Sequence, residues 1–156
     1  MEEATFSYIH EFIARYQTLV IATEDEAQPY ATRIFFVEEP VTATSCKLYG
    51  TLITSSRKLA NLQKNPRVGL FIGPDLPSSW LEATAQAHVL NDEQSAAEVR
   101  AKLAAKSPAA AAFISRVPTA AVELEITWLR ITDLSRTPPY TEVTFDANSA
   151  TGASSV

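Results

Sequence analysis

The sequence of 156 residues contains one cysteine and four glycines, and it lacks any apolar run near the ~18 residues that a membrane-spanning helix requires. The single cysteine, Cys46, excludes an internal disulfide and a cysteine-rich zinc site. Because no histidine lies near Cys46 in the sequence, we expect an inert thiol in a turn or at a strand edge. The few glycines do not form a glycine-rich phosphate loop, which excludes the Rossmann and P-loop fingerprints.

Composition and charge favour a folded, acidic protein. Charged residues make up 20% of the chain and apolar residues 46%, which argues against disorder in most of it. The net charge of −5 disfavours nucleic-acid partners, because an acidic surface repels phosphate backbones. The acidic start Met-Glu-Glu-Ala is unlike a secretory signal, so we expect a cytoplasmic protein without a membrane partner. We predict one domain over residues 1–147 and a flexible C-terminal tail over residues 148–156.

Hydrophobic periodicity predicts strands that follow one another through short turns or single short helices. The predicted strands cover residues 18–23, 30–37, 47–53, 67–72, 80–90 and 121–134, the last as one strand or a strand pair. The predicted helices cover residues 4–16, 57–64, 91–106 and 108–116. The apolar run 67–72 predicts a strand that is buried on both faces. Long βαβ alternation is absent, so we predict a mainly β (α+β) fold, an antiparallel barrel with a few covering helices.

The start of the helix predicted at 57–64 is rich in hydroxyl groups and cations. Thr54, Ser55, Ser56, Arg57 and Lys58 occupy the positions where a helix N-terminus follows a strand. The first backbone N–H groups of a helix lack intrahelical partners, and this end carries partial positive charge. Cations are disfavoured there unless an anion offsets them, so the segment predicts a site for a phosphate group. The two serines have an alternative role, because either of them can cap the helix.

A second cation, Arg33, lies in the otherwise apolar strand predicted at 30–37. A buried arginine is costly without a partner, so we predict that Arg33 binds the same phosphate; the alternative is a side chain that reaches solvent. The two histidines, His10 and His88, are far apart in the sequence and neither has ligand spacing around it. The sequence therefore predicts no metal site.

Several segments in this order resemble the pyridoxamine 5′-phosphate oxidase-like FMN-binding split barrels. They are residues 32–37 (TRIFFV), 48–51 (LYGT), 56–62 (SRKLANL), 64–70 (KNPRVGL) and the strand from Trp80 to Leu90, and the resemblance covers roughly residues 5–134. It implies a split barrel that forms a homodimer with FMN at the subunit interface. It also implies that Arg33 and the Ser-Arg-Lys segment hold the phosphate. The implied cofactor-binding residues are Arg33, Ile34, Phe35, Phe36, Thr51, Leu52, Ile53, Thr54, Ser55, Ser56, Arg57, Lys58 and Trp80.

The sequence departs from the oxidase pattern at its substrate residues. Glu38 stands where the oxidase carries a lysine, Trp80 stands in place of a glutamine, and the C-terminal arginine and histidine of the oxidase have no counterpart. The resemblance therefore implies an FMN-binding oxidoreductase with an unidentified small-molecule substrate and no assigned catalytic residue. The alternative is a non-catalytic protein that stores, senses or delivers a cofactor such as flavin, heme or a deazaflavin.

Overall fold

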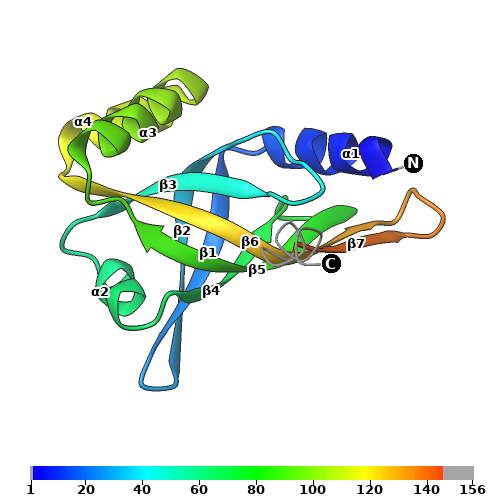
Figure 1. Ribbon diagram of the computed structural model, residues 1–156, viewed down its shortest axis with the longest axis horizontal. Helices are drawn as coiled ribbons and strands as arrows, with labels where there is room; N and C mark the ends of the chain where they lie inside the picture. Colours follow the sequence, from blue (N-terminus) through cyan, green and yellow to red (C-terminus); the bar gives the residue numbers. More distant parts are fainter. Residues whose placement is uncertain (1, 146–156) are drawn as a thin grey trace, which may run out of the picture.

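Seven antiparallel strands form one sheet in the structure, a computed structural model that describes residues 2–145. The strand order is β3-β2-β1-β4-β5-β6-β7, and an additional pairing of β3 with β6 closes the first six into a barrel (Figure 1). The elements are α1 (Glu2–Ala14), β1 (Thr18–Asp25), β2 (Gln28–Glu38), β3 (Lys47–Ile53), α2 (Arg57–Lys64), β4 (Arg67–Ile72), β5 (Ser79–Val89), α3 (Glu93–Lys106), α4 (Pro108–Arg116), β6 (Thr119–Asp133) and β7 (Tyr140–Thr144).

The length of β6 allows the barrel to close. This strand has 15 residues, so its first half pairs with both β3 and β5 while its second half pairs with β5 and β7. The register of the β5–β6 ladder shifts between Thr84 and Ala85, and such a bulge bends a strand and increases its twist. The predicted antiparallel split barrel with covering helices is therefore confirmed.

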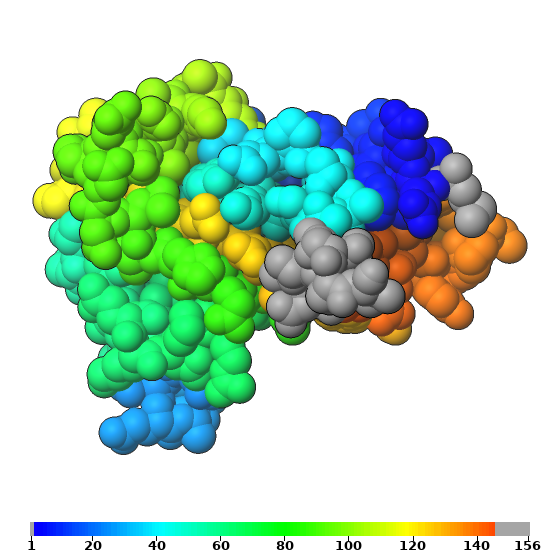
Figure 2. All heavy atoms as spheres, viewed as in Figure 1, coloured from blue at the N-terminus to red at the C-terminus, as the bar shows by residue number. Residues whose placement is uncertain are grey.

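The barrel interior is filled by alternating side chains of its strands, as the two-residue period of a β-strand requires. Leu48 and Leu52 of β3 and Leu124 of β6 have 0% exposure. The helices α1 and α2 add their apolar faces to this core, with Phe12 of α1 fully buried and Leu59 of α2 nearly so. The turn of the β1–β2 hairpin projects from the body of the molecule (Figure 2).

The helices α3 and α4 lie together against the outside of the barrel, over β2, β3 and β6 (Figure 1). A second apolar cluster forms there, in which Val99 and Leu103 of α3 and Ala110 of α4 pack near Phe35 and Tyr49 of the barrel wall. Because one side of the wall is covered in this way, outward-facing residues of β2 and β3 are partly buried. This cover forms one wall of the site described below.

Ser107 connects the two covering helices and is buried. Its Oγ accepts a hydrogen bond from the backbone N–H of Ala110 at 3.2 Å, as an N-cap does, and donates one to Oε1 of Gln17 at 2.9 Å. We expect Ser107→Ala to lower the free energy of unfolding by about 1–2 kcal/mol, because it removes the cap and leaves a buried N–H unpaired.

Thermal unfolding followed by circular dichroism measures this effect, which corresponds to a Tm lower by roughly 3–6 °C. Ser115→Ala is the matched control, since Ser115 is exposed and bonds only to a carbonyl of its own helix. An equal Tm for the Ser107 and Ser115 variants would contradict the capping role.

The structure corrects two predictions about the elements and decides an alternative that the sequence left open. The strand β4 is not buried on both faces: its residues alternate, and Phe71 is 37% exposed, because the α3–α4 cover does not reach this wall. The region predicted as one strand or a pair is the single strand β6, and the sequence analysis missed β7. The hairpin strands β1 and β2 run further into the acidic turn than predicted, so that only Glu26 and Ala27 connect them, with φ of 49° and 68°.

The predicted inert thiol is buried at 1% exposure, and burial raises the pKa of Cys46 to about 12. The tail predicted at 148–156 lies outside the described residues. No helix within residues 2–145 is long and apolar enough to cross a membrane.

Candidate functional site

A cavity of about 270 Å³ lies on the covered side of the barrel wall. It contains six of the residues that the sequence singles out, together with Thr18 and Phe113. Its lining residues are Thr18, Arg33, Ile34, Phe35, Thr51, Ile53, Lys58 and Phe113. They come from β1, β2, β3, α2 and α4, so the site exists only when the barrel is closed and its cover is in place.

The two cations of the cavity lack acidic partners. Arg33 donates one long hydrogen bond to Oγ1 of Thr18, at 3.5 Å, and is otherwise exposed. Lys58 is half-buried, and burial lowers the pKa of its ammonium group from the ordinary value. Among residues 2–145, no carboxylate lies within ion-pair distance of either side chain. A desolvated ammonium beside a guanidinium is an arrangement that an anion stabilises.

The cavity also contains a hydroxyl group without a partner. Thr51 has 2% exposure, and its Oγ1 makes no hydrogen bond within the described part of the chain. A buried hydroxyl without a partner costs about 1–3 kcal/mol, and such groups are uncommon outside sites that receive a ligand or water. Thr51 therefore points to a polar ligand in this cavity, independently of the two cations.

Aromatic side chains form the apolar wall. Phe35 of β2 and Phe113 of α4 lie in tilted contact, with ring centroids 5.8 Å apart. The sequence analysis missed Phe113 because nothing in an alanine-rich helix signals its contact with a strand that is distant in the sequence. It also missed Thr18, although a polar residue that alternates with buried ones at the start of β1 was a usable signal.

Four more of the predicted residues directly precede Lys58 in the chain but do not line the cavity. Ser56 is the N-cap of α2, where its Oγ accepts from the backbone N–H of Leu59 at 3.3 Å. Arg57 stacks over the ring of Tyr30, with its guanidinium carbon 5.3 Å from the ring centroid. Thr54 and Ser55 are exposed in the loop before α2. The segment therefore provides Lys58 to the cavity, and the side chains around Lys58 have other contacts.

Two predicted residues, Phe36 and Leu52, have 0% exposure and point into the barrel core. Only the backbone of these two residues is able to face a ligand on the outer side. Glu38, which stands in place of the oxidase lysine, accepts a hydrogen bond from Nζ of Lys106 at 2.7 Å. This lysine of α3 also lies 4.0 Å from the centroid of the Phe36 ring.

Trp80 lies on β5, three strands away from Arg33 in the sheet order. Neighbouring strands are about 4.8 Å apart, so the two residues are separated by roughly 14 Å along the sheet. Both side chains belong to the outer surface of the barrel, because each alternates with residues buried in the core. One subunit alone therefore does not bring Trp80 to the cavity.

A larger hollow, of about 550 Å³, lies on the wall that α3 and α4 leave uncovered. It is formed over β1, β4, β5 and β6, where residues such as Ala22, Gly69 and Thr84 have small side chains. None of the predicted cofactor residues lines it. Its width reflects the small side chains of an open surface, and we assign no ligand to it.

A sequence model of the family described as pyridoxamine 5′-phosphate oxidase matches residues 7–135. The chain belongs to this family. The match covers most of the barrel and every residue of the cavity, and it confirms the resemblance drawn from the sequence segments. A comparison with curated proteins gave no match.

Several solved structures have the same fold. A Clostridium acetobutylicum protein related to general stress protein 26 is 15% identical with a TM-score of 0.70, over 94% of this chain and 98% of that chain. The heme storage protein HutZ from Vibrio cholerae is 19% identical (TM-score 0.63; 77% and 88% covered). A FAD-binding protein from Mesorhizobium loti is 13% identical (TM-score 0.60; 80% and 90% covered). At these identities the similarity shows the fold alone.

Proposed function

We propose that this chain binds FMN in the Arg33–Lys58 cavity and acts as a flavin-dependent oxidoreductase. The observation that carries the proposal is the pairing of two cations without counter-ions and a buried unpaired hydroxyl with an aromatic wall. A phosphate needs cations and hydroxyl donors, and a flavin ring needs apolar and aromatic contacts. The one cavity offers both. The family membership and the FAD-binding neighbour support a flavin.

The residues of the cavity have distinct roles in this proposal. Arg33 and Lys58 hold the phosphate, and the Thr51 hydroxyl, which is free to donate, binds a polar atom of the cofactor. Phe35 and Phe113 exclude water from one face of the site. When bound, FMN supplies the redox chemistry itself, so that the protein only has to position it and admit a substrate. This agrees with the absence of a histidine or carboxylate among the residues that line the cavity.

A homodimer completes the site in this proposal. A cavity of about 270 Å³ lies just below the range of ligand sites, which span about 300–1,000 Å³. A two-fold symmetric interface allows a residue that is far from the cavity of its own subunit to contact the cavity of the other subunit. Trp80 of the partner subunit then supplies the flavin contact that the resemblance implies. In this arrangement, the uncovered wall of each subunit, which includes Phe71 at 37% exposure, packs against the cavity of the other subunit.

Heme storage, the description of HutZ, is less well supported for this cavity. Protein ligands to heme iron are usually histidine, cysteine, methionine or tyrosine, and none of these lines it. A deazaflavin with a phosphate remains chemically equivalent to FMN at Arg33 and Lys58.

The proposed function is tested by identifying the bound molecule. Protein purified under native conditions is denatured, and the released ligand is identified by absorbance and mass spectrometry. Apoprotein is then titrated with FMN, riboflavin, a deazaflavin and heme, and bound FMN is challenged with NADH and NADPH. Tight FMN binding followed by reduction supports the proposal. Binding of heme in preference to FMN contradicts it, and FMN that is never reduced leaves the non-catalytic alternative.

We expect Thr51→Val to have opposite effects on the stability of the apoprotein and on its affinity for FMN. Valine has the shape of threonine without the hydroxyl, so in the apoprotein we expect unchanged or higher stability, by up to about 1 kcal/mol, because a buried unpaired group is removed. We expect FMN binding to weaken about 3- to 10-fold, which corresponds to one neutral hydrogen bond. Thermal unfolding and fluorescence titration measure the two effects. The control is Thr23→Val, because Thr23 is buried but bonded to Asn61 at 3.0 Å, so its loss should only destabilise.

A further inference from the structure

A second group of side chains with ligand chemistry lies on the outer surface of β5 and β6, away from the cofactor cavity. His88 of β5 pairs directly with Glu123 of β6, and Glu125 follows two residues later on the same face. The candidate ligand atoms of these three residues all lie within 4.8 Å of one another. Spacing along the chain does not reveal this group, because the histidine and the carboxylates belong to different strands.

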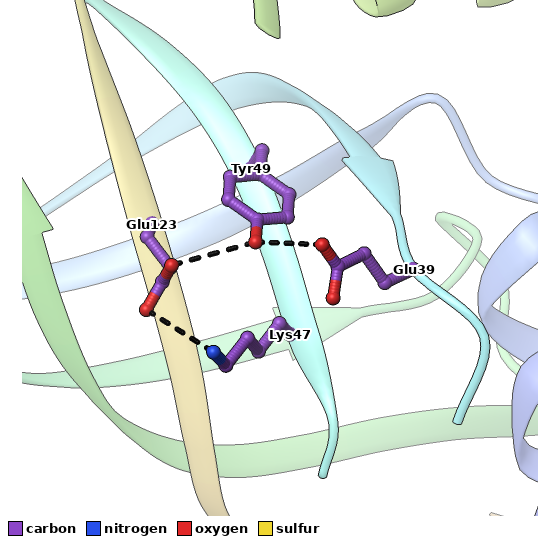
Figure 3. A network of polar contacts seen from close by, with 4 residues as sticks. All are labelled: Glu39, Lys47, Tyr49 and Glu123. Carbon is purple, nitrogen blue, oxygen red and sulfur yellow. Dashed lines mark hydrogen bonds and ion pairs between the residues drawn. The ribbon is translucent and has the colours of Figure 1, made fainter. Parts of the chain in front are cut away.

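The group carries an excess of negative charge. Within the described residues 2–145, Lys47 is the only cation within ion-pair distance of the group, with its Nζ 3.9 Å from Oε1 of Glu123. Tyr49 has one proton to donate and gives it to Glu39 at 2.7 Å, which leaves only a 3.4 Å contact with Oε2 of Glu123 (Figure 3). The side chains of His88 and Glu125 make no hydrogen bond or ion pair with any of residues 2–145. Two carboxylates and an imidazole thus lie close together with one ammonium group near Glu123.

We propose that His88, Glu123 and Glu125 bind a divalent transition-metal ion such as Zn²⁺. One imidazole nitrogen and two carboxylate oxygens are donors that zinc accepts, whereas Mg²⁺ and Ca²⁺ prefer oxygen ligands alone. Ligand atoms of a tetrahedral zinc site are roughly 3.4 Å apart, for bonds of about 2.1 Å. The side chains therefore have to close by at most about 1.4 Å from their 4.8 Å limit, which rotamer changes of half-buried and exposed side chains accommodate. Three protein ligands leave a position open for water or another ligand.

The strands hold the three ligands in place. Glu123 and Glu125 share a face because side chains of a strand alternate, and the β5–β6 ladder sets His88 opposite Glu123. Lys47 lies on β3 on the other side of β6, where it pairs with Glu125 in register. A bound cation takes over the carboxylate of Glu123 from this lysine. The site shares no residue with the cofactor cavity, so FMN binding is expected to be the same in variants of the two glutamates and the histidine.

Isothermal titration with ZnCl₂ tests this site on protein without a histidine tag, after treatment with EDTA and dialysis. We expect saturable binding of one ion per chain, no comparable binding of Mg²⁺, and affinity at least about tenfold lower for His88→Ala and for Glu125→Gln. His10→Gln is the matched control, because it removes the only other imidazole of the chain and should bind zinc as the wild type does. Unfolding curves in EDTA verify that each variant is folded.

Absence of saturable zinc binding in the wild type would overturn the proposal. Wild-type affinity in both His88→Ala and Glu125→Gln would overturn it too, because the ion would then bind elsewhere on the surface. The proposal would also be overturned if His10→Gln were the only variant that lost zinc binding.

Discussion

Replacing both Arg33 and Lys58 with alanine is expected to weaken FMN binding by more than about 100-fold. Each charge-assisted hydrogen bond to a phosphate contributes about 1.5–3 kcal/mol, so that the loss of two amounts to about 3 kcal/mol or more. Fluorescence titration of the apoprotein with FMN measures the change. Stability should change little, because Arg33 is exposed and Lys58 is a half-buried cation without a partner.

Riboflavin makes this test specific, because it carries the same ring without the phosphate. We expect the wild type and the double variant to bind riboflavin with similar, weaker affinity. The matched control is Lys64→Ala with Arg67→Ala, which removes two nearby cations that do not line the cavity. The proposal of a phosphate site at Arg33 and Lys58 fails if FMN affinity is unchanged, or if riboflavin and FMN lose affinity equally.

Local patterns were enough to predict most of the fold. Each strand up to β5, the helix α2 and its capping serine, Ser56, follow from alternation, propensity and turn residues in the sequence. What these patterns do not contain is the set of long-range pairings. The β3–β6 closure, and the docking of α3 and α4 on one wall only, decide which outward-facing residues are covered. This is why Phe71 is exposed in a strand that was predicted to be buried on both faces.

The candidate site was predictable to the extent that it is local. Arg33 and Lys58 stand out because cations in an apolar strand and at a helix N-terminus call for an anion, and the structure brings both to one cavity. The same reasoning predicted that Arg57 binds the anion. In the structure Arg57 does not line the cavity, and its guanidinium group stacks on the ring of Tyr30. Phe113, like the group formed by His88 and two glutamates, depends on contacts between elements and left no signal in the sequence.

Replacing Lys106 with alanine is expected to lower the free energy of unfolding by about 3 kcal/mol, and Tm by roughly 6–12 °C. Its ammonium pairs with Glu38 at 2.7 Å, and the two side chains are only 16% and 10% exposed. Removing the lysine leaves a carboxylate with little access to water and no partner, and it also removes the cation over the Phe36 ring. Chemical denaturation with urea measures the loss.

The position of Glu38, where the oxidase of this family has a lysine, makes this pair informative. The barrel wall accommodates the charge of Glu38 because Lys106 of α3 forms an ion pair with it. A double variant, Glu38→Gln with Lys106→Met, removes both charges at similar volume and should recover most of the stability. Lys102→Ala is the matched control on the same helix, where the exposed side chain should contribute less than about 0.5 kcal/mol. If the double variant is as unstable as Lys106→Ala, the unpaired carboxylate is not the cause of the loss, because no carboxylate remains at residue 38; the loss then comes from the ion pair and from the cation over the Phe36 ring.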